Sequence, residues 1–486
     1  MSTESASPTG LSRGSSAGLA EQLAARYADH IRQRLLAPGS RLPSIRDCAQ
    51  RHQVSPGTVV AAYDKLLGQG LLEAHGQRGF FVRQPTALRH SDIESAALTE
   101  RRSRLQLPIS ATTLMRGMFQ APGDRPMPGL GTLPVEWLDP AMLATAVKKA
   151  CNAHSSSGSH LQYGEPAGDG QLRRALVHVL AERGIPARAE QIITTVGATH
   201  ALDVVTRSLL RAGDSVLVDE PGWSVEYARL AALGLRVLAV PRRDDGPDLT
   251  VMEQIIEAQP PEQRPRLYVT VSVLHNPTGG SLSLQIAHRL LQLAQRHSLL
   301  ILEDDSYAHL APAHLPRLAA LDALERTIHV GGFSKILAPS FRVGYVAAPS
   351  RLIDRFVDTK LLSTLTTPGI TEQALAHCLE SGQLRRHAER VAHKLDAARS
   401  RTVRLAEAHE CHFATAPCGL FGWVDVGTDT DRLARDMLEE GWLLAPGSLF
   451  HATPRPTSLM RINFASTQDA RFWQAMADAR NRLRRN

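Results

Sequence analysis

The sequence predicts an α/β protein in which a large body, built on a mainly parallel sheet with helices on both faces, follows a small N-terminal module. Three observations support this prediction. From about residue 126 onward, strand-like runs such as "QIITTVG", "SVLVDEP", "RLYVTVSV" and "SLLILED" alternate with helical segments, as in a parallel sheet covered by helices. Ahead of that region, residues 19–84 contain three short helical patterns and two short strands. The 486 residues are also enough for two or three domains with a well-buried core.

The composition, with 43% hydrophobic and 21% charged residues, is that of an ordinary soluble globular protein. No run of about eighteen apolar residues indicates a membrane span, so we expect no membrane partner. Residues 1–18 are rich in Ser, Gly and Thr and lack the charged and apolar regions of a signal peptide, which predicts a disordered leader and a cytoplasmic protein. Five cysteines without a CxxC pair indicate neither disulfides nor a zinc site, so we expect no metal.

The positive charge is concentrated at the N-terminus. The whole chain has a formal net charge of +7, and residues 1–90 contain eleven Lys and Arg against six Asp and Glu. A small basic module ahead of a nearly neutral body suggests a polyanion as the partner of the module. The alternative is an ordinary solvated surface, since basic patches are common.

Helical signals begin at residue 19. Apolar residues recur every four positions and predict one stripe of a helix, at Leu19, Leu23, Tyr27, Ile31 and Leu35. After the break at Pro38-Gly39, Ser44 is placed to cap a second helix, with Asp47 as its capping-box partner. Ser55 is placed to cap a third helix, with Pro56 at its first position.

Two short strands follow the third helix. The segment "LLEAHGQRGFFVRQ" has a strand-like run on each side of a Gly-bearing turn. Two short helices joined by a tight turn, followed by this hairpin, predict a winged helix-turn-helix over residues 19–84. Residues 85–125 have mixed polarity, several prolines and no sustained period, and we expect them to form a linker.

The segment "RLPSIRDCAQRHQVSPGTVVAAYDKLLGQGLLEAHGQRGFFV" closely resembles the winged-helix DNA-binding domain of GntR-type transcription regulators. The similarity lies in Pro43-Ser44-x-Arg46, Ser55-x-x-Thr58-Val59, Tyr63, Leu66 and Gly79-Phe80-Phe81-Val82. It implies contacts with double-stranded DNA from the hydroxyl and guanidinium groups of Arg46, Ser55, Thr58, Tyr63 and Arg78. Taken singly, Ser55 as a cap, Tyr63 as a packing residue and Arg46 as a solvated charge are equally good interpretations.

The third helix departs from the GntR pattern at its start. It begins Ser-Pro-Gly-Thr, where relatives often have an arginine after the serine. Few side chains here are therefore long enough to read base edges. Sequence specificity would then depend on Thr58, Arg46 and the wing, or on the second half-site of a dimer.

Several residues of the body follow directly after predicted strands, at the edge where parallel sheets bind ligands. Gly197-Ala198-Thr199 opens a helix, where free N–H groups form an anion pocket. The others are Trp223 in "EPGW", Asn276 in "HNPTG", Asp304 and Tyr307 in "DDSY", Lys335 and Arg342 in "FSKILAPSFRVGY", and Arg461 in "MRINF".

One ligand accounts for this set: a flat aromatic aldehyde with a phosphate, a phenolic oxygen and a ring nitrogen, namely pyridoxal 5'-phosphate (PLP). Lys335 is then the amine that forms a Schiff base with the aldehyde. The order of "YGEPAGDGQLRRAL", "GATHAL", "HNPTG", "DDSY", "FSKILAPSFRVGY" and "MRINF" resembles fold-type I aminotransferases over most of residues 126–486. A GntR-type winged helix joined to such a body is similar to the MocR group of regulators. The resemblance implies a fold-type I body with a smaller C-terminal α/β subdomain from about residue 360 to residue 486.

The resemblance also implies a role for each residue around the ring. Lys335 holds PLP and shuttles the Cα proton of an amino acid. Asp304 pairs with the pyridine N–H and keeps the ring an electron sink. Asn276 and Tyr307 donate hydrogen bonds to the ring oxygen, and Trp223 stacks on the ring. Lys335, Asp304 and Tyr307 are the expected catalytic residues.

Further roles concern the phosphate and the substrate. Arg342, with Gly197–Thr199, is expected to bind the phosphate. Tyr163 is expected to reach the phosphate of the neighbouring subunit's cofactor, which implies a homodimer. Arg461 matches the arginine that grips a substrate α-carboxylate. The sequence departs from the family pattern at Gly332, because relatives often have Ser or Thr three residues before the lysine to bind the phosphate. We therefore expect either a reduced affinity for the cofactor or another group that binds the phosphate in its place.

Two functions are compatible with these residues. The first is a DNA-binding transcription regulator whose PLP-bound body senses an amino acid, an amine or PLP itself. The alternative is a PLP-dependent aminotransferase, converting an amino acid to a 2-oxo acid, with a vestigial N-terminal module. The intact, capped helix-turn-helix with its basic bias favours the regulator, because catalysis does not need it. The full catalytic set leaves transaminase activity open.

Overall fold

The computed structural model of the chain describes residues 11, 17–32, 36, 38–75, 78–83, 127–153 and 162–485. These residues divide into two compact units: unit 1 contains residues up to Leu130 together with Asp431–Leu444, and unit 2 contains Gly131–Thr430 and Ala445–Asn486. The expected linker, residues 85–125, and nearly all of the expected leader, residues 1–18, lie outside the described residues and stay predictions. No described helix is both long and apolar enough to cross a membrane.

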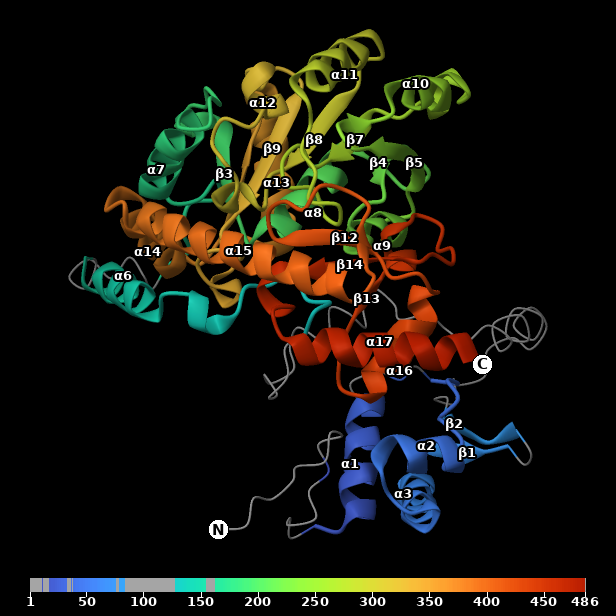
Figure 1. The fold of residues 1–486 in the computed structure, drawn as a ribbon. Coiled ribbons are helices and arrows are strands. Elements are labelled where there is room, and N and C mark those ends of the chain that lie inside the picture. Colours follow the sequence, from blue (N-terminus) through green and yellow to red (C-terminus); the bar gives the residue numbers. More distant parts are fainter. Residues whose placement is uncertain are drawn as a thin grey trace, which may run out of the picture. The chain divides into compact units, whose positions relative to one another are not determined.

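Unit 1 begins with three helices and a hairpin, in the order of a winged helix-turn-helix. The elements are α1 (Leu19–Arg32), α2 (Ile45–His52), α3 (Pro56–Gly68), β1 (Leu72–Ala74) and β2 (Phe80–Val82), drawn in blue in Figure 1. The strands β1 and β2 pair antiparallel, with Leu72 opposite Val82. The predicted stripe of α1 is buried at Leu23 and Tyr27, which pack with Val59 and Leu66 of α3 in one core. Most of α16 (Thr430–Glu439) also belongs to this unit.

Side-chain caps fix where α2 and α3 begin. The Ser44 hydroxyl accepts a hydrogen bond from the Asp47 amide at 3.2 Å, and Ser55 accepts one from the Thr58 amide at 3.1 Å. Pro56 occupies the first turn of α3, where its missing N–H leaves no bond unmade. The predicted N-terminal caps of both helices are confirmed.

Unit 2 is built on an eight-stranded sheet with the order β3-β10-β9-β8-β7-β4-β5-β6. Its strands are β3 (Ile192–Thr195), β4 (Ser215–Glu220), β5 (Arg236–Arg243), β6 (Gly246–Pro247), β7 (Leu267–Thr270), β8 (Leu300–Asp304), β9 (Thr327–Gly332) and β10 (Gly344–Ala347). All pairs from β5 through β4, β7 and β8 to β9 are parallel, while β10 runs antiparallel to β3 and β9. The prediction of a mainly parallel sheet is therefore confirmed.

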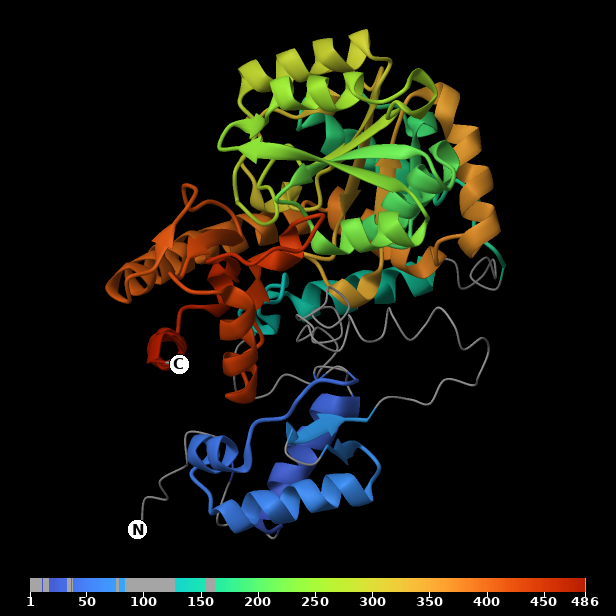
Figure 2. The ribbon, with the colours of Figure 1, turned by 90° about the vertical axis from the view of Figure 1, so that its right-hand side faces the viewer.

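Helices cover both faces of this sheet because its strands are apolar on both sides. In β4, Val216 and Val218 pack into one core with α8 (Ala198–Leu209), while Leu217 packs into a second core with α10 (Leu249–Glu257) and α11 (Leu284–Arg296). Continuous apolar strands of this kind are typical of parallel sheets buried on both faces. Figure 2 shows the sheet between these helical layers. The other helices of this region are α6 (Pro140–Ala153), α7 (Gly170–Ala181), α9 (Ser224–Ala232), α12 (Leu318–Leu321), α13 (Ser350–Thr364) and α14 (Gly369–Glu380).

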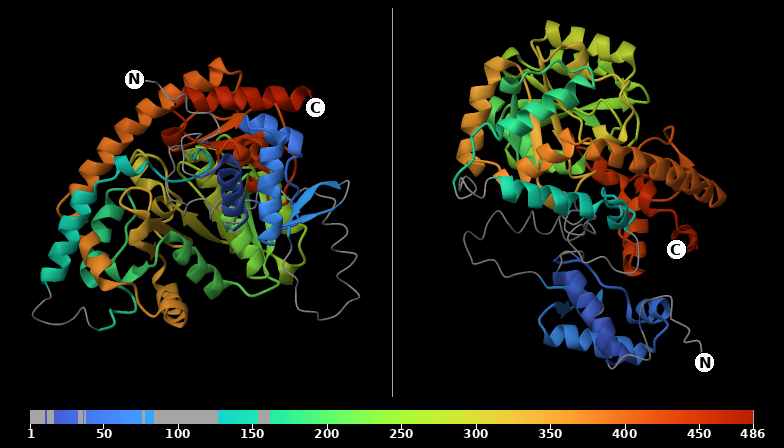
Figure 3. Two further views of the ribbon diagram at one scale, coloured as in Figure 1. Left: turned by 90° about the horizontal axis from the view of Figure 1, so that it is seen from below. Right: turned by 90° about the vertical axis from the view of Figure 1, so that its left-hand side faces the viewer.

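The C-terminal part of unit 2 forms a smaller sheet with two long helices. Its antiparallel strands follow the order β11-β12-β14-β13, with bounds β11 (His412–Phe413), β12 (Phe421–Asp425), β13 (Ala445–Pro446) and β14 (Leu459–Asn463). Trp423 of β12 lies opposite Arg461 of β14. The helices α15 (Gln383–Ala408) and α17 (Ala470–Arg485) lie at the outer edge of unit 2 (Figure 3).

Candidate functional site

A cavity lies at the carboxyl ends of β4, β7 and β8, the edge at which parallel sheets bind ligands. Its lining includes Gly222 and Trp223 after β4, Thr270 and His275 at the end of β7 and beyond, and Asp304 at the end of β8. Trp223 is partly exposed and precedes the first turn of α9. The structure therefore brings two of the expected cofactor residues, Trp223 and Asp304, to one cavity.

Lys335 follows β9 and is partly buried. Its removal from water lowers the pKa of the amine to about 8, and the positive charges of Arg461 and Arg342 lower it further while Asp304 opposes them. A Cβ atom at Gly131 would lie 3.3 Å from the Phe421 ring and 3.8 Å from Lys335 Nζ, so this glycine keeps the space beside the amine open. A neutral amine with free space next to it is suited to attack a carbonyl carbon.

Asp304 has the raised pKa of a carboxylate that is not paired with a cation. Its removal from water raises the pKa to about 6, although the amide and hydroxyl of Ser306 donate hydrogen bonds to it at 3.0 and 2.5 Å. Among the described residues, no Lys, Arg or His lies within ion-pair distance of Asp304. A protonated ring nitrogen would supply the missing positive partner.

Asn276, Tyr307 and Arg461 form a buried polar group beside Lys335. Arg461 donates a hydrogen bond from Nη1 to Asn276 Oδ1 at 2.9 Å, and its guanidinium lies over the rings of Phe421 and Phe450. Burial lowers the pKa of Arg461 to about 10. Burial also raises the pKa of Tyr307 above its usual range, which keeps its hydroxyl protonated and able to donate.

Arg342 faces the start of α8, where the phosphate is expected. Its Nη2 donates to the Val196 carbonyl at 3.1 Å and its Nη1 to the Ser334 hydroxyl at 3.0 Å. Gly197 caps α8 with a φ of 80°, and a Cβ there would lie 2.3 Å from Arg342 Nη2. Only glycine combines this conformation with such a close guanidinium. The helix N-terminus and Arg342 thus lie together, as an anion site requires.

Gly332 has a steric reason to depart from the family pattern. A Cβ at Gly332 would lie 3.2 Å from the Cβ of Ala198, so a hydroxyl-bearing side chain would crowd the first residue of α8. The nearby Ser334 hydroxyl, which accepts from Arg342, takes the position beside the anion site. Sequence reasoning overlooked Ser334, although it directly precedes Lys335 in "FSK".

Tyr163 is not part of this cavity in its own chain. Its side chain is 81% exposed, in the segment that precedes α7. All other expected cofactor and substrate residues lie around the edge formed by β4, β7, β8, β9 and the start of α8.

A buried network in the wall of the cavity was not predicted from the sequence. Asp219 at the end of β4 pairs with Arg242 at 2.9 Å, accepts from Thr270 Oγ1 at 2.7 Å and from the Tyr268 hydroxyl. His275 lies 3.7 Å from the same carboxylate. These residues come from β4, β5, β7 and the following turn, and no spacing in the sequence connects them.

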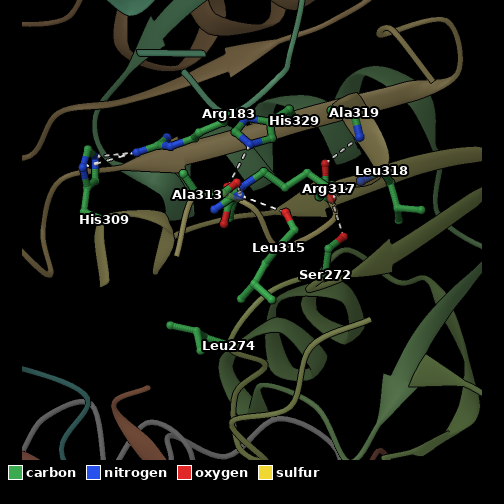
Figure 4. A network of polar contacts seen from close by, with 12 residues as sticks. Arg183, Ser272, Leu274, His309, Ala313, Leu315, Arg317, Leu318, Ala319 and His329 are labelled. Carbon is green, nitrogen blue, oxygen red and sulfur yellow. Dashed lines mark hydrogen bonds and ion pairs between the residues drawn. The ribbon is translucent and has the colours of Figure 1, made fainter. Parts of the chain in front are cut away.

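A second unpredicted network fixes the carboxylate next to Asp304. Asp305 pairs with Arg317 Nε at 2.6 Å and with His329 Nε2 at 3.3 Å. Although burial opposes the change, the hydrogen bond from His329 and the charge of Arg317 lower the pKa of Asp305 to about 2. Figure 4 shows Arg317 near His329, with Arg183 reaching toward His309. The two adjacent carboxylates therefore differ: Asp304 faces the cavity with a raised pKa, and Asp305 is held by its cations.

The expected DNA contacts lie on the surface of unit 1, with one exception. Arg46, Ser55 and Arg78 are exposed, and Thr58 is partly exposed beside Ser55, with a hydroxyl-to-hydroxyl distance of 2.8 Å. Tyr63 is a correction, because its side chain is fully buried and its hydroxyl donates to the Pro43 carbonyl at 3.0 Å. It packs in the core rather than facing DNA.

Two family models match the chain. The model described as aminotransferase class I and II matches residues 134–477, and the model described as bacterial regulatory proteins, gntR family, matches residues 19–82. The two matched ranges lie within residues 19–84 and 126–486.

Individual relatives are similar to this chain over different lengths. The uncharacterized HTH-type transcriptional regulator YisV of Bacillus subtilis is 27% identical over 94% of this chain and 95% of its own length. The 2-aminoadipate transaminase of Thermus thermophilus is 29% identical over 63% of this chain and 77% of its own length. The crystal structure of LysN, an alpha-aminoadipate aminotransferase of Thermus thermophilus complexed with N-(5'-phosphopyridoxyl)-L-leucine, has a TM-score of 0.69 at 25% identity, covering 80% of this chain and 98% of that chain.

Proposed function

We propose that this chain, which belongs to the class I and II aminotransferase family and has a gntR-family domain ahead of its aminotransferase domain, is a DNA-binding transcription regulator. The predicted fold class and the MocR-type combination of domains are confirmed. The observation that supports regulation most strongly is the N-terminal domain, which keeps capped helices and exposed polar residues that no aminotransferase step needs. Two relatives whose alignments cover 94% of this chain are named transcriptional regulators.

PLP is the cofactor of the aminotransferase domain. When bound, it supplies an aldehyde that captures amines and a ring that withdraws electrons. We assign Lys335 as the covalent attachment point, Asp304 as the partner of the ring nitrogen, and Asn276 with Tyr307 as donors to the ring oxygen. The orphan carboxylate of Asp304 and the open space beside Lys335 both support this assignment.

The phosphate site in this proposal combines a helix N-terminus with two side chains. The amides of Gly197–Thr199, the Arg342 guanidinium and the Ser334 hydroxyl supply hydrogen-bond donors. Trp223 at the cavity wall would cover one face of the ring.

The chain's own residues suit an amino acid as the sensed compound. Because its pKa is lowered to about 8, Lys335 is partly neutral near pH 7, and its free amine would be a base for the proton at Cα. The Arg461 guanidinium, next to Asn276, is placed to donate hydrogen bonds to an α-carboxylate. An amine without a carboxylate would lack that contact.

A homodimer is supported by exposed apolar side chains on one part of unit 2. Tyr163 is 81% exposed, and Leu362, Leu365 and Ile370, at the end of α13 and the start of α14, are exposed too. Gly164, next to Tyr163, is near the Thr367 carbonyl, 3.8 Å from where its Cβ would be, so these residues share one surface. Such a patch marks an association surface, and a partner there would receive Tyr163.

Regulation would then follow from a dimer with two states. Winged helices act in pairs on half-sites, so their spacing decides DNA affinity. An amino acid whose carboxylate is held by Arg461 would favour the state for which it has the higher affinity. The DNA-bound population changes accordingly.

Aminotransferase activity is the second candidate function. The observation that favours it is the complete set of Lys335, Asp304, Tyr307 and Arg461 around one site. A 2-aminoadipate transaminase is among the relatives.

The test measures DNA binding by the full chain loaded with PLP. A library of random duplexes is selected with the protein, and the selected duplex is titrated at several salt concentrations with and without mixed amino acids. We expect salt-dependent binding that changes with amino acids in the parent protein and does not change in Lys335→Ala. Absence of a selected duplex, together with turnover of amino acids to 2-oxo acids, would favour the enzyme instead.

A further inference from the structure

The outer helix of the smaller sheet, α15, carries more positive charge than its share. It contains seven Lys and Arg against three Asp and Glu, in a chain whose net charge is +7. The N-terminal module alone therefore does not account for the basic character of the protein.

The cations of α15 lie on one side of the helix. Five of these cations form what we call the α15 stripe: Arg386, Arg390, Lys394, Arg401 and Arg404. Successive members of the stripe are four, four, seven and three residues apart. At 3.6 residues per turn they fall within about 80° of arc. The acids Glu389, Asp396 and Glu407 share a separate strip, about 100° away by the same geometry. The buried face, with Leu384, Val391 and Leu395, is a third side.

The acids of α15 do not neutralise this stripe. Glu389 and Asp396 line a cavity of about 770 Å³ between α15, α7 and the segment after β8, and Asp396 pairs with Arg399, which is outside the stripe. Within the stripe, only Arg390 has a carboxylate partner among the described residues, Asp139 at 3.3 Å. Arg386 donates to the Ser381 carbonyl, and Lys394 lies 6.0 Å from the Trp137 ring.

The stripe is polar throughout, which decides between kinds of partner. A protein interface has an apolar core with aromatic anchors, yet no residue of α15 is among the exposed large hydrophobic side chains of the described chain. A nucleic-acid backbone needs only positive charge at regular intervals. With 1.5 Å rise per residue, the stripe is about 27 Å long, and a duplex of that length presents about eight phosphates per strand.

We propose that the α15 stripe is a second DNA-contacting surface, which binds the phosphate backbone of duplex DNA. This inference rests on the proposed regulator function. Contacts of this kind add affinity and position the complex without reading bases. Within the described part of the chain, Arg386, Lys394, Arg401 and Arg404 have no ion pair to break. The three arginines are substituted in the test, because Lys394 also lies 6.0 Å from the Trp137 ring.

The experiment compares two triple variants of the full, PLP-loaded protein with equal loss of charge. The first is Arg386→Gln, Arg401→Gln and Arg404→Gln. The control is Arg211→Gln, Arg264→Gln and Arg289→Gln, three exposed arginines elsewhere on unit 2, none with a carboxylate partner among the described side chains. Both are titrated with one 60-bp duplex of fixed random sequence over a series of KCl concentrations.

We expect the stripe variant to lower the slope of log affinity against log salt by about 3, one per lost phosphate contact, and the control to leave it unchanged. An unchanged slope in the stripe variant, or an equal loss in both variants, would overturn the proposal. A parent protein that fails to bind any duplex would instead refute the regulator function itself. Unchanged PLP absorbance and thermal unfolding in both variants confirm that the aminotransferase domain is intact.

Discussion

At the scale of single residues, the chain places a lysine where its ammonium form is disfavoured, and this is useful chemically. Partial burial lowers the pKa of Lys335, two arginines lower it further, and Asp304 opposes the effect. Burial raises the pKa of Asp304. Two groups of opposite type thus move toward neutral pH, as active sites require.

The rate at which the apo protein captures PLP should reflect the lowered pKa of Lys335. Only the neutral amine attacks the aldehyde, and with a pKa of about 8 the neutral fraction rises tenfold per unit below pH 8 and is nearly complete above it. The rate, followed by stopped-flow absorbance, should therefore level off near pH 8. A rate that keeps rising to pH 10 would show an unperturbed lysine.

The variant Arg461→Met tests the cause of that shift. Removing the guanidinium removes a positive charge that disfavours the ammonium, so the plateau should move to higher pH. Arg455→Met is the control, because Arg455 is exposed and lies near Glu220 rather than Lys335. An equal displacement in both variants would contradict a local effect.

Ser334 should contribute to PLP affinity, although relatives often have the phosphate-binding hydroxyl at the position of Gly332. Its Oγ accepts from Arg342 Nη1 at 3.0 Å, and hydrogen bonds to charged groups contribute about 1.5–3 kcal/mol. Ser334→Ala should weaken PLP binding by about 10-fold or more, measured by equilibrium dialysis. Ser350→Ala removes a hydroxyl that contacts Arg188 far from this site and should leave the affinity unchanged; an equal loss would make Ser334 merely structural.

At the scale of elements, α3 combines a structural cap with an expected DNA contact at one residue. The Ser55 hydroxyl accepts from the Thr58 amide, and it also lies on the exposed start of the helix. Substitution by alanine removes both functions together, so it cannot separate them. A different substitution is needed.

Ser55→Asp should separate the cap from the contact. Aspartate caps a helix as well as serine and its charge suits the N-terminus, so amide exchange protection in α3 should be kept. The added negative charge should repel phosphates and weaken DNA binding at least 10-fold by fluorescence anisotropy. Ser55→Ala should instead lose about 1 kcal/mol of local stability. Full DNA affinity in Ser55→Asp would contradict the assigned contact.

Local patterns predicted the helices of the N-terminal module and several strands of the body, but not the partners of the buried polar groups. The four-residue apolar spacing of α1 and the Ser–Pro start of α3 are local signals, and both helices were predicted. Tyr63 was expected to contact DNA because its hydroxyl suits phosphates, and the structure places it in the core. Asp305, Arg317 and His329 are brought together by three segments, and only the tertiary fold defines that contact.

At the scale of the whole molecule, one residue that is expected to bind the cofactor, Tyr163, lies outside the site around Lys335. Tyr163 is exposed and does not line the cavity of its own chain, and Leu362 at the end of α13 is exposed as well. Leu362 is 92% exposed, so no residue in the described part of its own chain covers this apolar side chain. Association through this surface would bury Leu362 and bring Tyr163 to the partner's cofactor.

Leu362→Glu should therefore break the proposed dimer without unfolding the chain. Because Leu362 is 92% exposed, the substitution removes no packing within one chain, but a charge buried without a partner at an interface is strongly unfavourable. Sedimentation should show monomers, and PLP affinity should fall since Tyr163 no longer reaches a partner. Leu284→Glu, at a leucine 62% exposed on α11, should leave both unchanged. A Leu362→Glu protein that stays dimeric would place the association surface elsewhere.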